Sequence, residues 1–261
     1  MSTPGANARI MQVDQAGPGG SGDRDGEAPA GAVRRVVLVL AKAPVPGRVK
    51  TRLTPPATPE GAAGIAAAAL LDTLDAAAAT LGAQVVVALE GDTAAAVRAD
   101  EIETALAPHV VVPQRGHTLG ERIAAAHDDV ATRFPAAVSV QIGMDSPQLD
   151  AGLLDDALRR VECGADAALG LALDGGWWTL ALARPRSAAI ITGVPTSTDD
   201  TGRLTLAALR TALGHDAVVE LPVLSDVDTA DDAVAVSELV PHGRFAHAVG
   251  DLLPVPGGVR P

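Results

Sequence analysis

The 261 residues of this chain carry a net charge of −12, which argues against a general nucleic-acid-binding protein, because such a protein presents a broad basic face. Tyr is absent and only two Phe and two Trp occur, so the core must be built from Leu, Val, Ile and Ala, the usual material of helices that cover a mostly parallel sheet. The single cysteine, Cys163, excludes an intramolecular disulfide and a Cys-based zinc cluster, which fits a cytoplasmic protein.

Short β-branched runs alternate with Ala- and Leu-rich helical stretches along most of the chain. Residues 1–32 are rich in Gly, Pro, Ser and Asp without periodicity, which predicts a disordered leader before a domain at 33–250 and a flexible tail at 251–261. The expected strands are 33–40, 85–89, 110–112, 138–142, 167–173, 178–182 and 218–222. The expected helices are 58–80, 93–106, 118–133, 150–161, a part of 198–213, and 229–239. This alternation predicts one α/β domain with a sheet wound by crossover helices.

The most apolar stretch of the chain, 61–71, is bounded by Glu60 and Asp72. It is shorter than the roughly 18 apolar residues that a membrane span needs, so we expect no membrane span.

A basic loop follows the first expected strand. The chain has only two lysines, Lys42 and Lys50, and both lie in the segment 41–53 together with Gly47, Arg48 and Arg52. Residues 28–59 contain six basic residues and no Asp or Glu. Because positive charges in a strand-to-helix loop suit an anion, this segment predicts a phosphate site. The alternative is a solvent-exposed, positively charged turn.

Three further polar clusters directly follow expected strands, at 143–147, 174–178 and 225–229. Ligands of a wound sheet bind at the carboxyl ends of its strands, so these clusters are candidate site segments. Asp145 is predicted to be paired, metal-bound or the N-cap of the next helix. The Asp174-Gly175-Gly176 sequence permits close approach of a ligand but is also a hairpin signal. Asp226 and Asp228 suit a hard divalent cation, unless Asp228 or Thr229 merely caps the following helix.

The clusters occur together in the order of a known bacterial family. The chain resembles the GT-A-fold nucleotide-diphospho-sugar transferase-like family, often labelled glycosyltransferase and related to the guanylyltransferases that act on phospholactate. The resemblance spans about residues 34–240 and implies a three-layer α/β/α sandwich with a mostly parallel, Rossmann-like (GT-A) sheet. The motifs that carry it are Lys-Ala-Pro-Val-Pro-Gly-Arg-Val-Lys-Thr-Arg-Leu, Leu-Gly-Glu-Arg, Gly-Met-Asp-Ser-Pro, Asp-Gly-Gly-Trp-Trp and Ser-Asp-Val-Asp-Thr.

The resemblance also implies a set of site residues. A nucleotide's phosphates are expected on the basic loop, at Lys42, Gly47, Arg48, Lys50 and Arg52. A divalent metal, Mg²⁺ or Mn²⁺, is expected on Asp145 and Asp228, and the catalytic residues are expected to be Lys50 and Asp145. The sugar or acceptor is expected at Asp174, Gly175, Gly176, Thr196, Ser197 and Thr198. The family usually has Trp at position 196 and favours Tyr where this chain has Trp177 and Trp178, so no tyrosine hydroxyl can act at the last two positions.

These residues predict a metal-dependent transferase that uses an activated nucleotide and a small-molecule acceptor. The family label favours glycosyl transfer from a nucleotide-diphospho-sugar. The basic loop suits a triphosphate that loses pyrophosphate, so the alternative is a guanylyl- or cytidylyl-type nucleotidyltransferase that joins a nucleotide to a phosphorylated small molecule. A non-catalytic nucleotide or sugar-phosphate binder is the third hypothesis. His117 and His127 are expected on solvated helix faces, without a role in the site.

Overall fold

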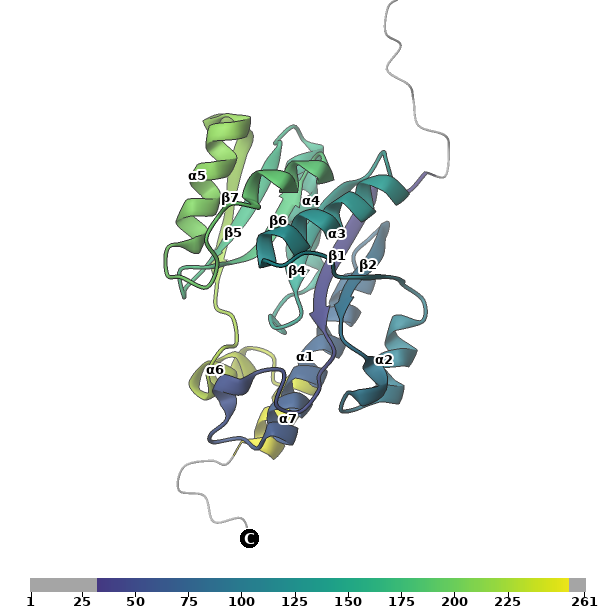
Figure 1. Cartoon of the computed structure of the whole chain (residues 1–261), viewed down its shortest axis with the longest axis vertical. Helices are drawn as coiled ribbons and strands as arrows, with labels where there is room; N and C mark the ends of the chain where they lie inside the picture. The colour runs from purple at the N-terminus through teal and green to yellow at the C-terminus, as the bar shows by residue number, and fades with distance from the viewer. Residues whose placement is uncertain (1–31, 254–261) are drawn as a thin grey trace, which may run out of the picture. The chain divides into compact units, whose positions relative to one another are not determined.

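The computed structural model describes residues 32–253, and it contains a seven-stranded mixed sheet (Figure 1). Residues 1–31 of the expected leader and 254–261 of the expected tail lie outside the described residues. The strands are β1 Arg35–Lys42, β2 Ala83–Glu90, β3 Val110–Pro113, β4 Val138–Gly143, β5 Ala167–Ala172, β6 Trp177–Leu182 and β7 Val218–Leu224. Each of the seven expected strands is found, and no strand end differs from the expected one by more than two residues.

The strand order is β3-β2-β1-β4-β6-β5-β7, and every pairing except those of β6 is parallel. The interior of β1, Val36–Ala41, is buried, as its unbroken apolar sequence predicts for a central strand that helices cover on both faces. Because β1, β2, β4, β5 and β7 run in one direction, the loops that follow them lie along the same edge of the sheet. The expectation of a mostly parallel α/β sheet is confirmed.

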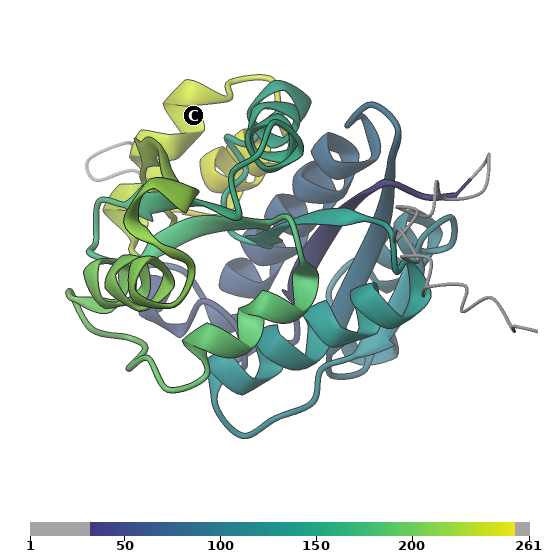
Figure 2. The ribbon, with the colours of Figure 1, turned by 90° about the horizontal axis from the view of Figure 1, so that it is seen from above.

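Helices cover both faces of the sheet and make three layers (Figure 2). One face carries α1 Pro59–Ala78, α2 Ala99–Leu106 and α4 Ala151–Glu162, whose apolar side chains form a first core cluster with Val37, Val39, Val140 and Ile142. The other face carries α3 Leu119–Arg133, the 3₁₀ helix η3 Pro185–Ile191 and α5 Thr201–Leu213. These elements form a second core cluster with Leu38, Leu40, Leu169 and Leu180.

Helix α1 is buried on a further side by α6 Ala230–Leu239 and α7 Arg244–Leu252. Thr58 caps its first turn as expected, because its hydroxyl accepts a hydrogen bond from the amide of Gly61 at 3.0 Å. By length and composition α1 is apolar enough to cross a membrane, but 78% of its most apolar window is buried inside the domain. A helix that packs between two layers of its own domain has the same composition as a membrane span, so its hydropathy is explained by the core.

Three features differ from the sequence-based expectation. Segment 93–106 is a 3₁₀ turn at Thr93–Ala95 followed by α2, because Arg98 has a left-handed φ of 61° that ends helical geometry between them. Helix α7 and η3 were not predicted, and α7 extends past the expected domain end at residue 250. His127 lies on the buried face of α3 and not on a solvated one, with its Nδ1 3.2 Å from the Ser139 hydroxyl. His117 is exposed as expected, but it lies in the bend before α3 and not on a helix face.

Candidate functional site

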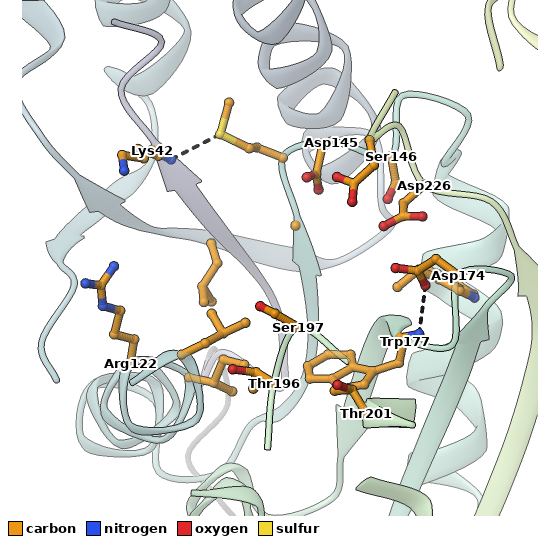
Figure 3. Close-up of a pocket in the computed structure, with 18 of the residues that line it drawn as sticks. Lys42, Arg122, Asp145, Ser146, Asp174, Trp177, Thr196, Ser197, Thr201 and Asp226 are labelled. Atoms are coloured by element: carbon orange, nitrogen blue, oxygen red, sulfur yellow. Dashed lines mark hydrogen bonds between the residues drawn. The ribbon is translucent and has the colours of Figure 1, made fainter. Parts of the chain in front are cut away.

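A cavity of about 830 Å³ opens at the carboxyl edge of the sheet, between the loops that follow β1, β4, β5 and β7 (Figure 3). All four of the polar clusters that the sequence singles out reach it. Of the expected site residues, those that line the cavity are Lys42, Arg48, Lys50, Arg52, Asp145, Asp174, Gly176, Thr196, Ser197, Thr198 and Asp228. Gly47 and Gly175 do not line it. The φ angles of these two glycines, 74° and 89°, lie in the left-handed region, so both residues form turns that position neighbouring residues at the cavity.

Lys50 is the residue that joins three of the loops. Its Nζ donates a hydrogen bond to Asp145 Oδ2 at 2.9 Å and a second one to the carbonyl oxygen of Val227, and it lies 3.9 Å from Asp228 Oδ1. The side chain is only 11% exposed, so this lysine is not part of a solvated turn. Its backbone has a φ of 45°, a left-handed conformation that is unfavourable for a residue with a Cβ. The loop therefore holds Lys50 in a strained conformation that directs its ammonium group at the carboxylates.

The other basic residues of the loop are more accessible. Arg52 donates from Nη1 to Asp228 Oδ2 at 2.8 Å while its side chain stays 71% exposed, and Arg48 is exposed. Lys42 lies across the cavity, 3.9 Å from Glu90, whose other oxygen accepts a hydrogen bond from Arg122 at 2.6 Å. Glu90 and Arg122 were not assigned to the site from the sequence, although Arg122 stands in the Leu-Gly-Glu-Arg motif. Positive charge therefore approaches the cavity from two sides.

Asp145 does not cap a helix, because Asp150 caps α4 by accepting a hydrogen bond from the amide of Leu153 at 2.8 Å. Desolvation alone would raise the pKa of Asp145, but the charge of Lys50 and the hydrogen bond that it donates hold this pKa below its ordinary value. Asp228 is likewise no cap, since Thr229 caps α6 in a capping box with Asp232. Asp145 is therefore ionised, and the carboxylates of both residues line the cavity.

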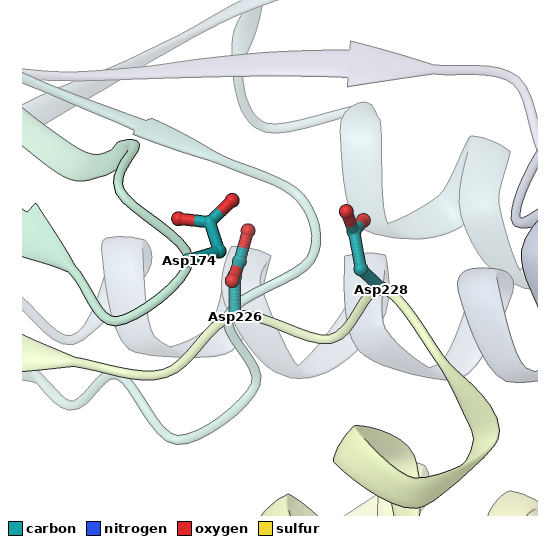
Figure 4. A group of neighbouring side chains, drawn as sticks. All are labelled: Asp174, Asp226 and Asp228. Carbon is teal, nitrogen blue, oxygen red and sulfur yellow. The ribbon is translucent and has the colours of Figure 1, made fainter. Parts of the chain in front are cut away.

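Three carboxylates come close enough to share one cation: Asp174, Asp226 and Asp228 each contribute an oxygen within 4.8 Å of the others (Figure 4). Burial, followed by the negative charges of Asp174, Asp228 and Asp145, raises the pKa of Asp226 to about 6. Such mutual repulsion is what a bound cation relieves, and carboxylate oxygens are the ligands that Mg²⁺ and Mn²⁺ prefer. The donor set therefore fits a divalent metal.

This group differs from the pair that the resemblance implies. Asp145 and Asp228 do lie at the same edge of the sheet, but the ammonium group of Lys50 lies between them. Asp174, expected to contact the sugar or acceptor, belongs to the acidic group instead, and so does Asp226. The signal for Asp226 was present in the sequence, as the Asp-Val-Asp spacing after an expected strand.

The Asp174-Gly175-Gly176 segment belongs to the hairpin turn between β5 and β6, and Asp174 and Gly176 also line the cavity. Gly175 is required here, because a Cβ on it would lie 2.0 Å from the carbonyl oxygen of Asp199. The amide of Gly202 donates to the carbonyl oxygen of Gly175 at 2.7 Å. These contacts fasten the turn to the start of α5, and residues 196–198 just before α5 are thereby placed along the cavity.

The two tryptophans have different surroundings. The indole of Trp178 is buried against Gly170, where no other residue leaves room for it, and its Nε1 donates to the carbonyl oxygen of Pro222 at 2.9 Å. Trp177 lies beside Thr196, Ser197 and Thr201 in the cavity wall (Figure 3). Trp178 is therefore structural, and Trp177 offers an aromatic surface to a ligand.

Comparison with known proteins places this geometry in context. A family model described as "Uncharacterized protein conserved in bacteria (DUF2064)" matches residues 73–198, just under half of the chain. A search of curated proteins gives no match. The structure resembles a putative nucleotide-diphospho-sugar transferase from Desulfovibrio desulfuricans G20, with 26% identity and a TM-score of 0.69, over 85% of this chain and 99% of that one.

A cytidylyltransferase from Leptospira borgpetersenii serovar Hardjo-bovis shares the fold at 12% identity, with a TM-score of 0.52 over 84% of this chain and 93% of that one. The likeness that the sequence motifs predict is thus confirmed: this chain has the GT-A-like fold of the nucleotide-diphospho-sugar transferase-like proteins and is similar to them over most of its length.

Proposed function

We propose that this protein is a metal-dependent transferase that moves a sugar from a nucleotide-diphospho-sugar to a small-molecule acceptor. The observation that carries the proposal is the meeting, in one cavity, of the acidic group Asp174, Asp226 and Asp228 with the ammonium group of Lys50. A diphosphate needs both a cation and fixed positive side chains to bind and to leave. A similar protein is described as a putative nucleotide-diphospho-sugar transferase, which favours this reaction class.

Each group has a role in this reaction. Arg48 and Arg52, on the basic loop, are exposed and attract the diphosphate. Lys50 exchanges its hydrogen bond with Asp145 for one with a phosphate oxygen, and it stabilises the charge that develops on the diphosphate as its bond to the sugar breaks. Asp174, Asp226 and Asp228 would hold the metal ion, which would act as a Lewis acid on the same diphosphate. Asp145, released from Lys50, becomes available to the metal or to the acceptor.

Nucleotidyl transfer is the second candidate. A loop with several basic residues suits a triphosphate, whose pyrophosphate carries more charge than a diphosphate ester, and a cytidylyltransferase shares the fold. In that reaction the same residues bind the α- and β-phosphates, and the acceptor is a phosphorylated small molecule. The two reactions differ in what leaves: a nucleoside diphosphate in one case and pyrophosphate in the other.

Thermal unfolding with a ligand panel tests the proposal. UDP-glucose, GDP-mannose, ADP-glucose and the four nucleoside triphosphates are each added with Mn²⁺, Mg²⁺ or EDTA, because a ligand that binds the folded state raises the melting temperature. We expect a nucleotide-sugar to stabilise the protein only when the metal is present. Stabilisation by triphosphates alone, with pyrophosphate release in the presence of sugar phosphates, would favour nucleotidyl transfer. Metal-independent binding without any turnover would favour a non-catalytic binder.

The location is also a proposal. The one cysteine is compatible with a reducing compartment, and nucleotide-sugars and nucleoside triphosphates are abundant in the cytoplasm, so we propose that the protein acts there.

A further inference from the structure

Gln141 is a buried polar residue of the sheet that lines the cavity. It lies in the middle of β4, in register with Leu38 of β1 and Leu180 of β6, both of which are fully buried. Val140 and Ile142 point into the first core cluster, so the alternation of a strand directs Gln141 toward the second. The residue is 4% exposed, and its side-chain carbonyl oxygen has no hydrogen-bond partner among residues 32–253.

The neighbouring polar residues of the sheet are satisfied. Ser139, two residues earlier on the same face, is 3.2 Å from His127 Nδ1. The hydroxyl of Thr179 donates to the main-chain carbonyl oxygen of Gln141 at 2.9 Å. Buried polar groups are rarely left without a partner, because they lose on folding the hydrogen bonds that water makes to them in the unfolded chain. Gln141 also lines the cavity, so the partner that it lacks in the protein can be a group of the ligand.

The cavity wall around Gln141 is chemically distinct from the rest. We define the neutral wall as Ile123, Gln141, Trp177, Thr196, Ser197 and Thr201, all of which line the cavity and none of which carries a charge. Figure 3 shows Trp177, Thr196, Ser197 and Thr201 on the side of the cavity opposite Asp145 and Asp226. A wall that combines hydroxyls, a carboxamide, an aromatic ring and an aliphatic side chain suits a group that has both hydroxyls and an apolar face.

We propose that Gln141 determines specificity for the sugar ring of the nucleotide-diphospho-sugar, an inference that rests on the proposed function. A sugar hydroxyl both donates and accepts hydrogen bonds, and a carboxamide does the same, so the two groups are complementary. The apolar face of the ring packs against Trp177, while its diphosphate reaches the acidic group and Lys50 on the other side of the cavity. A site that hydrogen-bonds a substrate hydroxyl discriminates strongly against ligands without it.

Calorimetric titration of Gln141→Met tests this assignment, because methionine has a similar length and shape but forms no such hydrogen bond. Each nucleotide-sugar is compared with its own nucleoside diphosphate: UDP-glucose with UDP, GDP-mannose with GDP, and ADP-glucose with ADP, all with Mn²⁺. For the pair that binds, we expect the affinity for the nucleotide-sugar to fall about tenfold, which equals about 1.4 kcal/mol. The affinity for the diphosphate should stay within about twofold of the wild-type value.

Thr73→Val is the matched control. Within the described part of the chain the Thr73 hydroxyl is also buried without a partner, but this residue lies in α1 and does not line the cavity. Both variants should melt at or above the wild-type temperature, since each removes a buried unpaired polar atom, and only Gln141→Met should change the ratio of the two affinities. An equal loss for diphosphate and nucleotide-sugar would assign Gln141 to the nucleotide, and unchanged affinities for both would leave it a structural residue; either result overturns the proposal. If none of the six ligands binds the wild-type protein, the proposed function fails as well.

Discussion

Lys50 occupies the position of a cation among carboxylates. Its ammonium group is held by Asp145 and the carbonyl oxygen of Val227 and lies near Asp228, while the strained backbone of Lys50 limits the alternatives open to it. A bound metal ion would therefore compete with Lys50 for the same negative charge, until the phosphate groups of a bound nucleotide gave Lys50 another partner. Replacing Lys50 should therefore change the affinity for metal and the affinity for nucleotide in opposite directions.

Lys50→Ala should bind nucleotide more weakly, by about 1.5–3 kcal/mol for a charge-assisted contact, because a phosphate oxygen loses its ammonium partner. Without nucleotide, the same variant should bind Mn²⁺ more tightly than the parent, since the competing charge is gone. Isothermal titration of each ligand measures both effects. Arg184→Ala, which removes an exposed arginine paired with Asp166, is the control and should change neither affinity. An unaltered nucleotide affinity in Lys50→Ala would remove the basic loop from the site.

A second prediction at the residue scale concerns the acidic group Asp174, Asp226 and Asp228. Asp226→Asn and Asp228→Asn should each weaken Mn²⁺ binding by tenfold or more, on the order of 1.4 kcal/mol, because an amide oxygen lacks the full charge of a carboxylate. Electron paramagnetic resonance of free Mn²⁺ gives these affinities. Asp145→Asn and Asp228→Asn should also abolish metal-dependent turnover while circular dichroism stays unchanged. If Asp226→Asn bound Mn²⁺ as well as the wild type, the site would revert to Asp145 and Asp228.

His127 gives stability a pH dependence of known sign. Burial lowers the pKa of its imidazole from the ordinary 6.5 to about 3, so between these values the unfolded chain binds a proton that the folded protein does not. The stabilising contribution is fully present above about pH 6.5 and is lost as the pH falls toward 3, by up to about 1.4 kcal/mol per pH unit. Urea unfolding at several pH values should therefore show a shallower decline for His127→Gln than for the wild type. Parallel declines would show that His127 is not protonated on unfolding.

At the scale of elements, the sequence predicts strands and long helices well and short elements poorly. The strands are short, mainly apolar runs, and several of them end at or beside Gly, Asp or Pro; such runs have few alternatives in a wound sheet. Helix α7 is short and contains a glycine, so its propensity is weak. Its place depends on tertiary contacts: Phe245 and Val249 pack with apolar side chains of α1 and α6, and Asp72 of α1 accepts hydrogen bonds from the amides of Arg244 and Phe245.

Phe245→Ala should therefore destabilise the domain although it lies far from the cavity lining. The side chain is fully buried, and removing it leaves a void between α1, α6 and α7. The expected loss in the free energy of unfolding is about 3–5 kcal/mol, measured by urea denaturation. Val234→Ala, at an exposed position of α6, should change this free energy by less than about 0.5 kcal/mol. A similarly small effect of Phe245→Ala would show that α7 is not part of the cooperative fold.

For the molecule as a whole, the sequence predicts which segments form the site better than which atoms meet in it. Parallel strands bring the loops after β1, β4, β5 and β7 to one edge, and this follows from topology alone. The grouping of Asp226 with Asp174, and the position of Lys50 between Asp145 and Asp228, depend on side-chain directions and on one left-handed residue. Gln141 was not predicted, because a glutamine in a mainly apolar strand gives no signal in the sequence. Only the structure shows that its side-chain oxygen has no hydrogen-bond partner among the described residues.

The leader remains a prediction at this scale, because residues 1–31 lie outside the described part of the chain. Their composition cannot bury enough apolar surface to offset the entropy of ordering, so a protein that starts at Ala32 should melt at the same temperature as the full chain. Differential scanning calorimetry of the two proteins makes this comparison. A melting temperature several degrees lower for the shorter protein would show that residues 1–31 pack on the domain.

The reversed direction of β6 has a consequence for how specificity can change. Because β5 ends and β6 begins at the same edge, one hairpin supplies Asp174 and Trp177 to the cavity, and the chain then returns through η3 to supply Thr196, Ser197 and Thr201. The basic loop and Asp145 come from the preceding part of the chain, residues 35–145. Most of the neutral wall therefore comes from one continuous stretch, residues 167–201, and only Ile123 and Gln141 come from earlier in the chain. Exchanging residues 167–201 between relatives should alter the preferred sugar or acceptor, while the preferred nucleotide base stays the same. Competition binding with free nucleotides would measure the base preference of the exchanged protein.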